Sequence, residues 1–220
     1  MSSYALEARG LGKRFGNTVA LCGLDLAVSK GEVICLLGAN GAGKTTTINL
    51  FLGFLQADEG KALVHGIDAG KAPLDARRKL AYLPESVALY PKLSGIENLR
   101  FFDRLAGGTR SDSELGKLLE TVGLAAEAHQ RHADTYSKGM RQKVGIAIAM
   151  ARQAKTLLLD EPMSGLDPSA ASDTVPLDAT PTRTADIESP SASLAPARRS
   201  FFTLPTQPGL PWPSTWNSAM

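Results

Sequence analysis

The sequence predicts an α/β fold, in which short apolar strands alternate with helices, followed by a C-terminal tail of different composition. Three observations support this prediction. A glycine-rich loop joins an apolar run to a helix-like segment, a second apolar run ends in two carboxylates near residue 160, and a serine-capped apolar helix is expected between them.

The first strands are expected in the N-terminal part of the chain. Tyr4 to Phe15, Leu21 to Val28 and Lys61 to Ile67 are apolar-rich runs punctuated by glycine, a pattern typical of strands. Cys22 and Cys35 fall in apolar runs without the C-x-x-C spacing of a metal or redox site, so both are expected to be reduced thiols in the core.

The loop from Gly38 to Thr45 reads GANGAGKT and matches the phosphate-binding P-loop pattern G-x-x-x-x-G-K-[ST]. It follows the buried-strand run Val33 to Leu37 and precedes a helix expected over Thr46 to Leu55, and this context argues against a chance glycine-rich turn. Backbone N–H groups and the Lys44 ammonium would hold a triphosphate, and the Thr45 hydroxyl would bind Mg²⁺. The expected phosphate-binding residues are Gly38, Ala39, Asn40, Gly41, Ala42, Gly43, Lys44, Thr45 and Thr46.

Three further segments lie between the loop and the carboxylates. Ser94 to Leu105 and Asp112 to Val122 are expected to be helices, the second with its leucines on one face. Pro73 to Leu80 contains three consecutive basic residues and is predicted to be a solvated face.

A capped helix is expected where YSKGMRQK, residues 136–143, precedes the apolar run Val144 to Ala151. Ser137 would cap this helix and leave its other N–H groups and the positive end of its dipole free to act on a ligand. Taken alone, the segment is better explained as an ordinary capped, buried helix, and the motifs on either side of it reverse this preference.

The strand expected over Thr156 to Leu159 ends in Asp160, Glu161 and Pro162. A carboxylate at the end of a buried strand is costly unless it binds something. Asp160 is expected to hold Mg²⁺ and Glu161 to accept a proton from an attacking water, a role worth about 10²–10⁴-fold in rate. A strand that simply reaches the surface is the alternative, and the P-loop upstream argues against it.

In this order the motifs resemble those of the ATP-binding cassette (ABC) family, whose signature motif LSGGQ is matched at Ser137 and Gly139. The YSKGM form is similar to those of bacterial ATPases that partner ABC-2-type exporters. The resemblance covers about Leu6 to Asp173 and implies a P-loop NTPase (RecA-like) fold. That fold has a parallel core sheet, an N-terminal antiparallel β subdomain and a helical signature lobe, here at about 88–150 within a nucleotide-binding domain at 1–173.

The resemblance also implies roles for individual residues. Phe15 lies where the family places an aromatic ring under adenine. Glu85 replaces the usual Q-loop glutamine, and this departure still offers an oxygen to Mg²⁺ and the attacking water. Ser164 to Asp167 matches the D-loop. Ser137 and Gly139 would contact ATP bound to a second cassette.

The tail, residues 174–220, is rich in Pro, Ser, Thr and Ala and is predicted to be disordered. The family would have here a helix and a strand that ends in the switch histidine, whereas His65, His129 and His132 all precede Asp160. That strand would lie between the P-loop strand and the Asp160 strand, so its loss is expected to leave a gap between neighbours that are normally about 4.8 Å apart. Ser200 to Leu204 is the tail's one strand-like run, and its use as a substitute is not expected. We interpret the chain as a frameshifted or truncated gene product, with a natural proline-rich regulatory tail as the alternative.

The function implied is ATP binding and hydrolysis, with Mg²⁺, by a subunit that powers a membrane permease. Lys44, Glu85 and Glu161 would be its catalytic residues, and Thr45, Glu85 and Asp160 its metal ligands. Two cassettes would pair head to tail, and the permease would choose the substrate. The chain has no signal-peptide pattern and is expected to be cytoplasmic, held at the inner face of the cell membrane by the permease.

Two other functions stay open. A degenerate module with little or no hydrolysis is favoured by the missing histidine. A cytosolic ABC protein that acts on ribosomes or DNA ranks last, and no nucleic-acid partner is expected, since the net charge is only +2 and no second cassette is visible.

Overall fold

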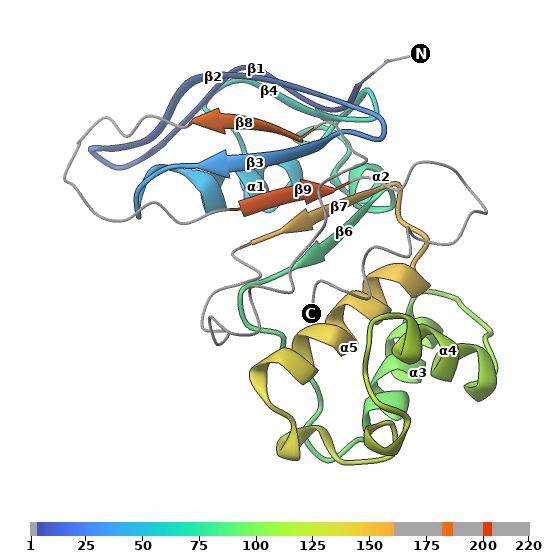
Figure 1. The fold of residues 1–220 in the computed structure, drawn as a ribbon. Coiled ribbons are helices and arrows are strands. Elements are labelled where there is room, and N and C mark those ends of the chain that lie inside the picture. Colours follow the sequence, from blue (N-terminus) through green and yellow to red (C-terminus); the bar gives the residue numbers. More distant parts are fainter. Residues whose placement is uncertain (1–3, 161–181, 187–199, 204–220) are drawn as a thin grey trace. The chain divides into compact units, whose positions relative to one another are not determined.

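The computed structural model describes residues 4–160, 182–186 and 200–203 (Figure 1). The described residues form two compact units. Residues 4–82, 155–160, 182–186 and 200–203 make a sheet unit, and residues 83–154 make a helical unit. The predicted α/β class is confirmed. None of the helices in the described ranges is both long and apolar enough to cross a membrane.

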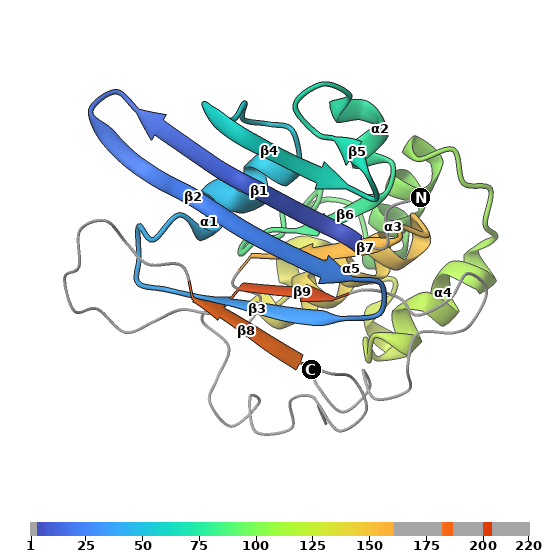
Figure 2. The ribbon, with the colours of Figure 1, turned by 90° about the horizontal axis from the view of Figure 1, so that it is seen from above.

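The first sheet is antiparallel, and its strands follow the order β2-β1-β4-β5 (Figure 2). The bounds are β1 Tyr4–Phe15, β2 Thr18–Ser29, β4 Glu59–Val64 and β5 Ile67–Asp68. β1 covers the predicted residues, and β2 extends beyond the prediction at both ends. The strand predicted from Lys61 to Ile67 is instead divided, because His65 and Gly66 form a turn with positive φ angles of 49° and 83°.

The second sheet has the strand order β6-β7-β9-β3-β8 (Figure 1). The bounds are β3 Val33–Leu37, β6 Leu80–Leu83, β7 Thr156–Leu159, β8 Thr182–Asp186 and β9 Ser200–Thr203. β9 is antiparallel to both β3 and β7, and β8 is parallel to β3. β3 and β7 therefore run in the same direction, so the P-loop after β3 and Asp160 after β7 leave the sheet at the same edge.

The position of β9 corrects two predictions from the sequence. The expected central gap is filled, because β9 pairs through Phe202 with Ile34 on one side and Leu158 on the other. Against the expectation that the run at 200–204 does not substitute for the missing strand, Ser200–Thr203 forms β9 there, and Thr182–Asp186 forms β8. The unpaired N–H and C=O groups of two central strands are costly, so an antiparallel run of high β-propensity substitutes for the parallel strand that the family pattern would supply.

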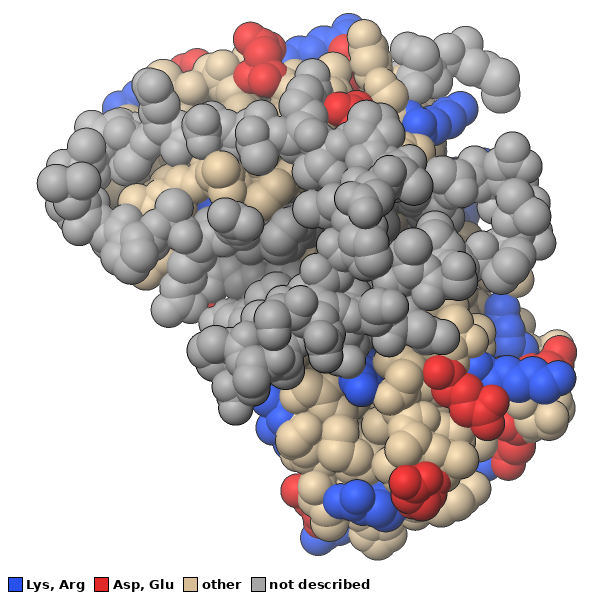
Figure 3. Space-filling view, viewed as in Figure 1, with Lys and Arg blue, Asp and Glu red and all other residues tan. Residues whose placement is uncertain are grey.

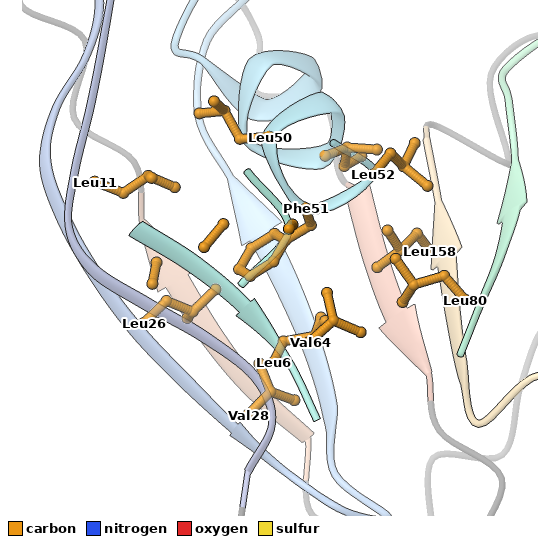
Figure 4. Close-up of a cluster of buried hydrophobic side chains, with 14 of the residues drawn as sticks. Leu6, Leu11, Leu26, Val28, Leu50, Phe51, Leu52, Val64, Leu80 and Leu158 are labelled. Atoms are coloured by element: carbon orange, nitrogen blue, oxygen red, sulfur yellow. The ribbon is translucent and has the colours of Figure 1, made fainter. Parts of the chain in front are cut away.

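The core of the sheet unit lies around helix α1 (Lys44–Phe51). Phe51, which is fully buried, lies among side chains of the first sheet such as Leu6 and Val64 (Figure 4). Leu158 of β7 and Leu80 of β6 belong to the same cluster. Burying each such side chain contributes about 1.5–3 kcal/mol, so this cluster holds α1, and with it the P-loop, against both sheets.

Two local predictions in the sheet unit are wrong. Cys35 is buried but Cys22 is exposed, because β2 is an edge strand and only one of its faces is covered. Residues 73–80, which include helix α2 (Pro73–Arg77), do not form a purely solvated face, since Ala76 and Leu80 are buried. The Arg77 guanidinium donates to the Leu52 carbonyl at 3.0 Å and lies 5.2 Å from the centroid of the Phe54 ring.

The helical unit is built from helices α3, α4 and α5. The bounds are α3 Gly95–Leu105, α4 Asp112–Thr121 and α5 Lys138–Ala151, with short 3₁₀ turns η1 Ala126–Ala128 and η2 Ala133–Thr135. Capping boxes start two of them: Ser94 with Glu97 begins α3, and Ser111 with Glu114 begins α4. Figure 3 shows acidic and basic side chains interspersed over the described surface of this unit. The two helices predicted at residues 94–105 and 112–122 correspond to α3 and α4, and their ends differ from the prediction by at most one residue.

Candidate functional site

The loop from Gly38 to Lys44 joins the C-terminal end of β3 to the first turn of α1. Gly43 is the N-cap residue, has a φ of 93°, and offers no side chain to cap the helix. The first N–H groups of α1 therefore have no capping side chain as acceptor, and they carry the positive end of the helix dipole, about half a charge. This is the arrangement in which a phosphate is the natural acceptor. The helix begins at Lys44 and ends at Phe51, not at Thr46 and Leu55 as predicted. It begins earlier because Gly43 of the loop is itself the N-cap residue.

Gly43 is also required sterically. A Cβ atom placed there would lie 2.5 Å from the Ala20 carbonyl oxygen, in addition to the cost of the positive φ. We expect Gly43→Ala to destabilise the protein by well over the about 1–2 kcal/mol that left-handed backbone alone costs. Gly16→Ala is the matched control, because Gly16 also has a positive φ, 57°, but no atom lies within 4 Å of the position that its Cβ would occupy. Thermal unfolding without nucleotide measures both, and equal shifts would contradict this account of Gly43.

Lys44 is only 5% exposed and its ammonium is bound by its own loop. Nζ donates to the carbonyl oxygens of Gly38 at 2.8 Å and Ala39 at 3.0 Å. A phosphate oxygen is a stronger acceptor for the ammonium than a neutral carbonyl, because it carries a negative charge that attracts the positive donor. The ammonium is therefore positioned to exchange a loop carbonyl for a phosphate.

Asp160, at the end of β7, is 7% exposed and is contacted by two hydroxyl groups. Thr45 Oγ1 lies 3.2 Å from Oδ2 and 3.4 Å from Oδ1, and the Tyr82 hydroxyl lies 3.4 Å from Oδ2. Burial and the neighbouring carboxylate raise the pKa of Tyr82 to about 12, so this phenol stays a protonated donor at neutral pH. Tyr82 was not singled out from the sequence, where it is one aromatic residue in a short strand.

The residues at this point fit Mg²⁺. A carboxylate and a hydroxyl lie together beside a loop built for phosphate, and Mg²⁺ is commonly held by one or two protein oxygens together with phosphate oxygens and water. Asp160 and Thr45 would hold the ion. Glu161 and the D-loop, Ser164 to Asp167, lie outside the described residues.

Phe15 lies at the end of the β1–β2 hairpin and is 48% exposed. It pairs with Thr18, two residues before Ala20, whose carbonyl borders Gly43 of the loop. The Lys13 ammonium lies 5.6 Å from the centroid of the Phe15 ring. The exposed ring therefore lies on the hairpin whose Ala20 carbonyl borders the P-loop.

The remaining predicted site residues belong to the helical unit. Ser137 is the N-cap of α5 and accepts a hydrogen bond from the Met140 N–H at 3.2 Å, which confirms the predicted cap. Gly139 follows in the first turn of the helix. Lys138, between the two matched signature positions, lies 3.9 Å from a Glu85 carboxylate oxygen. The sequence did not predict this pair, which joins the residue at the Q-loop position to the signature segment.

The three histidines are divided between the two units, and only His65 belongs to the sheet unit. His65 Nε2 lies 2.9 Å from the Thr156 hydroxyl, at the start of the strand, and a four-residue strand spans about 13 Å. His129 is buried in the helical unit, where Nε2 lies 3.0 Å from the Leu124 carbonyl. His132 precedes η2 in the same unit. Within the sheet unit the imidazole is therefore at the opposite end of β7 from Asp160.

The chain is similar in sequence and in fold to known proteins. The sequence model of the ABC transporter family matches residues 21–164. The linearmycin resistance ATP-binding protein LnrL of Bacillus subtilis (strain 168) is 35% identical over 167 residues, which are 75% of this chain and 53% of that protein. The daunorubicin resistance ATP-binding protein DrrA2 of Streptomyces coeruleorubidus is 39% identical over 170 residues, which are 76% of this chain and 52% of that protein. A solved structure of an ATP-binding subunit of an ABC transporter is 32% identical with a TM-score of 0.64, covering 74% of this chain and 69% of that one. The chain spans about half the length of these curated relatives.

Proposed function

Because this chain belongs to the ABC transporter family, we propose that it is an ATP-binding and ATP-hydrolysing subunit that powers transport by a membrane-embedded partner. The observation that supports this most directly is the contact between Thr45 and Asp160. These residues are 115 positions apart in the sequence, yet their oxygen atoms lie 3.2 Å apart, beside the P-loop. A hydroxyl and a carboxylate at a phosphate loop are the groups that a nucleotide-bound Mg²⁺ needs.

The residues act together on the bound triphosphate. The N–H groups of the first turn of α1 and the Lys44 ammonium bind the β- and γ-phosphates, and Phe15 stacks on the base. Thr45 and Asp160 hold Mg²⁺, which neutralises charge on the phosphates. Glu161, directly after Asp160, accepts a proton from the attacking water, and Glu85 helps to orient that water.

The partners follow from the same proposal. Ser137 caps the first turn of α5 in the signature segment. We infer that this end of the helix contacts the ATP bound by a second cassette in a head-to-tail pair. A permease subunit would hold the pair at the inner face of the cell membrane and would choose the transported substrate. Residues 1–173 would form the nucleotide-binding domain.

The role of Glu161 supplies the test of hydrolysis. We expect Glu161→Gln to keep Mg²⁺-ATP affinity within about twofold and to lower the steady-state hydrolysis rate by about 10²-fold or more, because the amide cannot accept the proton. Glu120→Gln is the control, since Glu120 is exposed on α4 in the helical unit. Unchanged hydrolysis in Glu161→Gln would contradict the assigned base.

A second candidate function is nucleotide binding with little or no hydrolysis. It is favoured by one observation, the absence of a histidine after Asp160 in these 220 residues. Loss of one group that stabilises the transition state costs about 10²–10³-fold in rate. The same experiment distinguishes the candidates, because the degenerate module would bind ATP while the unaltered chain and Glu161→Gln hydrolyse it equally slowly.

A further inference from the structure

Tyr82 is placed by its strand to reach the end of the neighbouring strand. It lies on β6, which is hydrogen-bonded to β7 in the second sheet. Its ring is half-buried and packs against the hydrophobic cluster that also contains Leu80 and Leu158. The hydroxyl extends past this cluster to Asp160, where it donates to Oδ2 at 3.4 Å. The ring therefore anchors the residue, and the hydroxyl is left to act on the carboxylate.

Asp160 is held by donors from two different elements. Thr45 at the start of α1 donates toward both carboxylate oxygens, at 3.2 Å and 3.4 Å, whereas Tyr82 on β6 donates to Oδ2 alone. A carboxylate that one hydroxyl contacts can still turn about its side-chain bonds. A second donor, which comes from a strand and not from the P-loop helix, restricts that rotation.

We propose that Tyr82 is a positioning residue that orients Asp160 for Mg²⁺ in the Mg²⁺-ATP complex. The inference rests on the proposed function and goes beyond it, because it assigns to β6 a part in metal affinity. Groups that orient a metal ligand through a hydrogen bond typically change metal affinity about 10–100-fold when they are removed. The bond here is long, so we expect an effect at the lower end of that range.

The experiment removes the hydroxyl and keeps the ring. Tyr82→Phe retains the packing against the cluster, and Tyr90→Phe is the matched control, because Tyr90 is a tyrosine of the helical unit that is 49% exposed. ATP affinity of the full chain is measured by calorimetry as Mg²⁺ is raised from none, with EDTA, to saturation. The quantity compared between variants is the Mg²⁺ concentration at which half of the Mg²⁺-dependent gain in ATP affinity is reached.

We expect Tyr82→Phe to need about 10-fold more Mg²⁺ to reach half of this gain, while its ATP affinity in EDTA and its thermal unfolding match those of Tyr90→Phe and the unaltered chain. An unchanged Mg²⁺ requirement would overturn the inference. So would an equal loss of ATP affinity in EDTA, since that outcome places the effect on the loop and not on the metal. If the unaltered chain binds no ATP under either condition, the proposed function itself fails.

Discussion

Replacing Lys44 with alanine is expected to lower ATP affinity and hydrolysis by about 10²–10³-fold each, the largest loss from any one side chain of the site. The reason lies in the position of the ammonium. It is buried at the loop and donates there to the neutral carbonyls of Gly38 and Ala39, so its full charge is available to a phosphate. Equilibrium binding of Mg²⁺-ATP and steady-state hydrolysis measure the two losses.

The same change should also lower the stability of the fold. Removing the ammonium takes away two hydrogen bonds from a charged donor to loop carbonyls, each with a net worth of about 1.5–3 kcal/mol. Lys61→Ala, on the exposed side of β4, is the control for loss of a positive charge. If Lys44→Ala hydrolysed ATP as fast as Lys61→Ala, the P-loop would not be the site of hydrolysis.

Proline at position 202 is expected to have the largest effect on folding. Phe202 lies in β9, paired with Ile34 of β3 and Leu158 of β7, and in a central antiparallel strand each N–H points to one of the two neighbours. Phe202→Pro removes that donor and leaves a buried acceptor unpaired, at a cost of at least about 2 kcal/mol. For a chain of this size that lowers the melting temperature by about 4–8 °C.

Gln207→Pro is the control for a proline elsewhere in the tail, because it lies outside the described strands. Thermal unfolding of the full chain compares the two variants. We expect Phe202→Pro also to weaken Mg²⁺-ATP binding, since β9 is the strand that joins β3 to β7. Equal melting temperatures for the two proline variants would contradict the position of β9 at the centre of the sheet.

The parts of the fold that could be predicted from the sequence are those determined by residues close together in the chain. The run Val33 to Leu37, the glycine-rich loop and the helix after it are consecutive, so their spacing alone predicts a strand, a phosphate loop and α1. The Ser137 cap and the strand that ends at Asp160 are equally local. The comparisons confirm the family that these motifs predict.

The features that could not be predicted depend on pairings across the chain. β9 is a four-residue run followed closely by proline. It forms a strand because it pairs with the edges of β3 and β7, which would otherwise be unpaired. β8 is a polar run, Thr182–Asp186, that becomes a strand by pairing with β3. The contact of Tyr82 with Asp160 and that of Lys138 with Glu85 arise from strand order and helix packing, for which no alternation or spacing in the sequence gives a signal.

The central claim is that β9 completes the sheet and so holds the P-loop and Asp160 at one Mg²⁺-ATP site. Calorimetric titration of ATP into the full chain, with Mg²⁺ and with EDTA, beside Phe202→Pro, tests it most directly. The account predicts that Mg²⁺ tightens ATP binding by the unaltered chain and that this tightening is lost in Phe202→Pro. If Phe202→Pro binds Mg²⁺-ATP as tightly as the unaltered chain, the claim is contradicted.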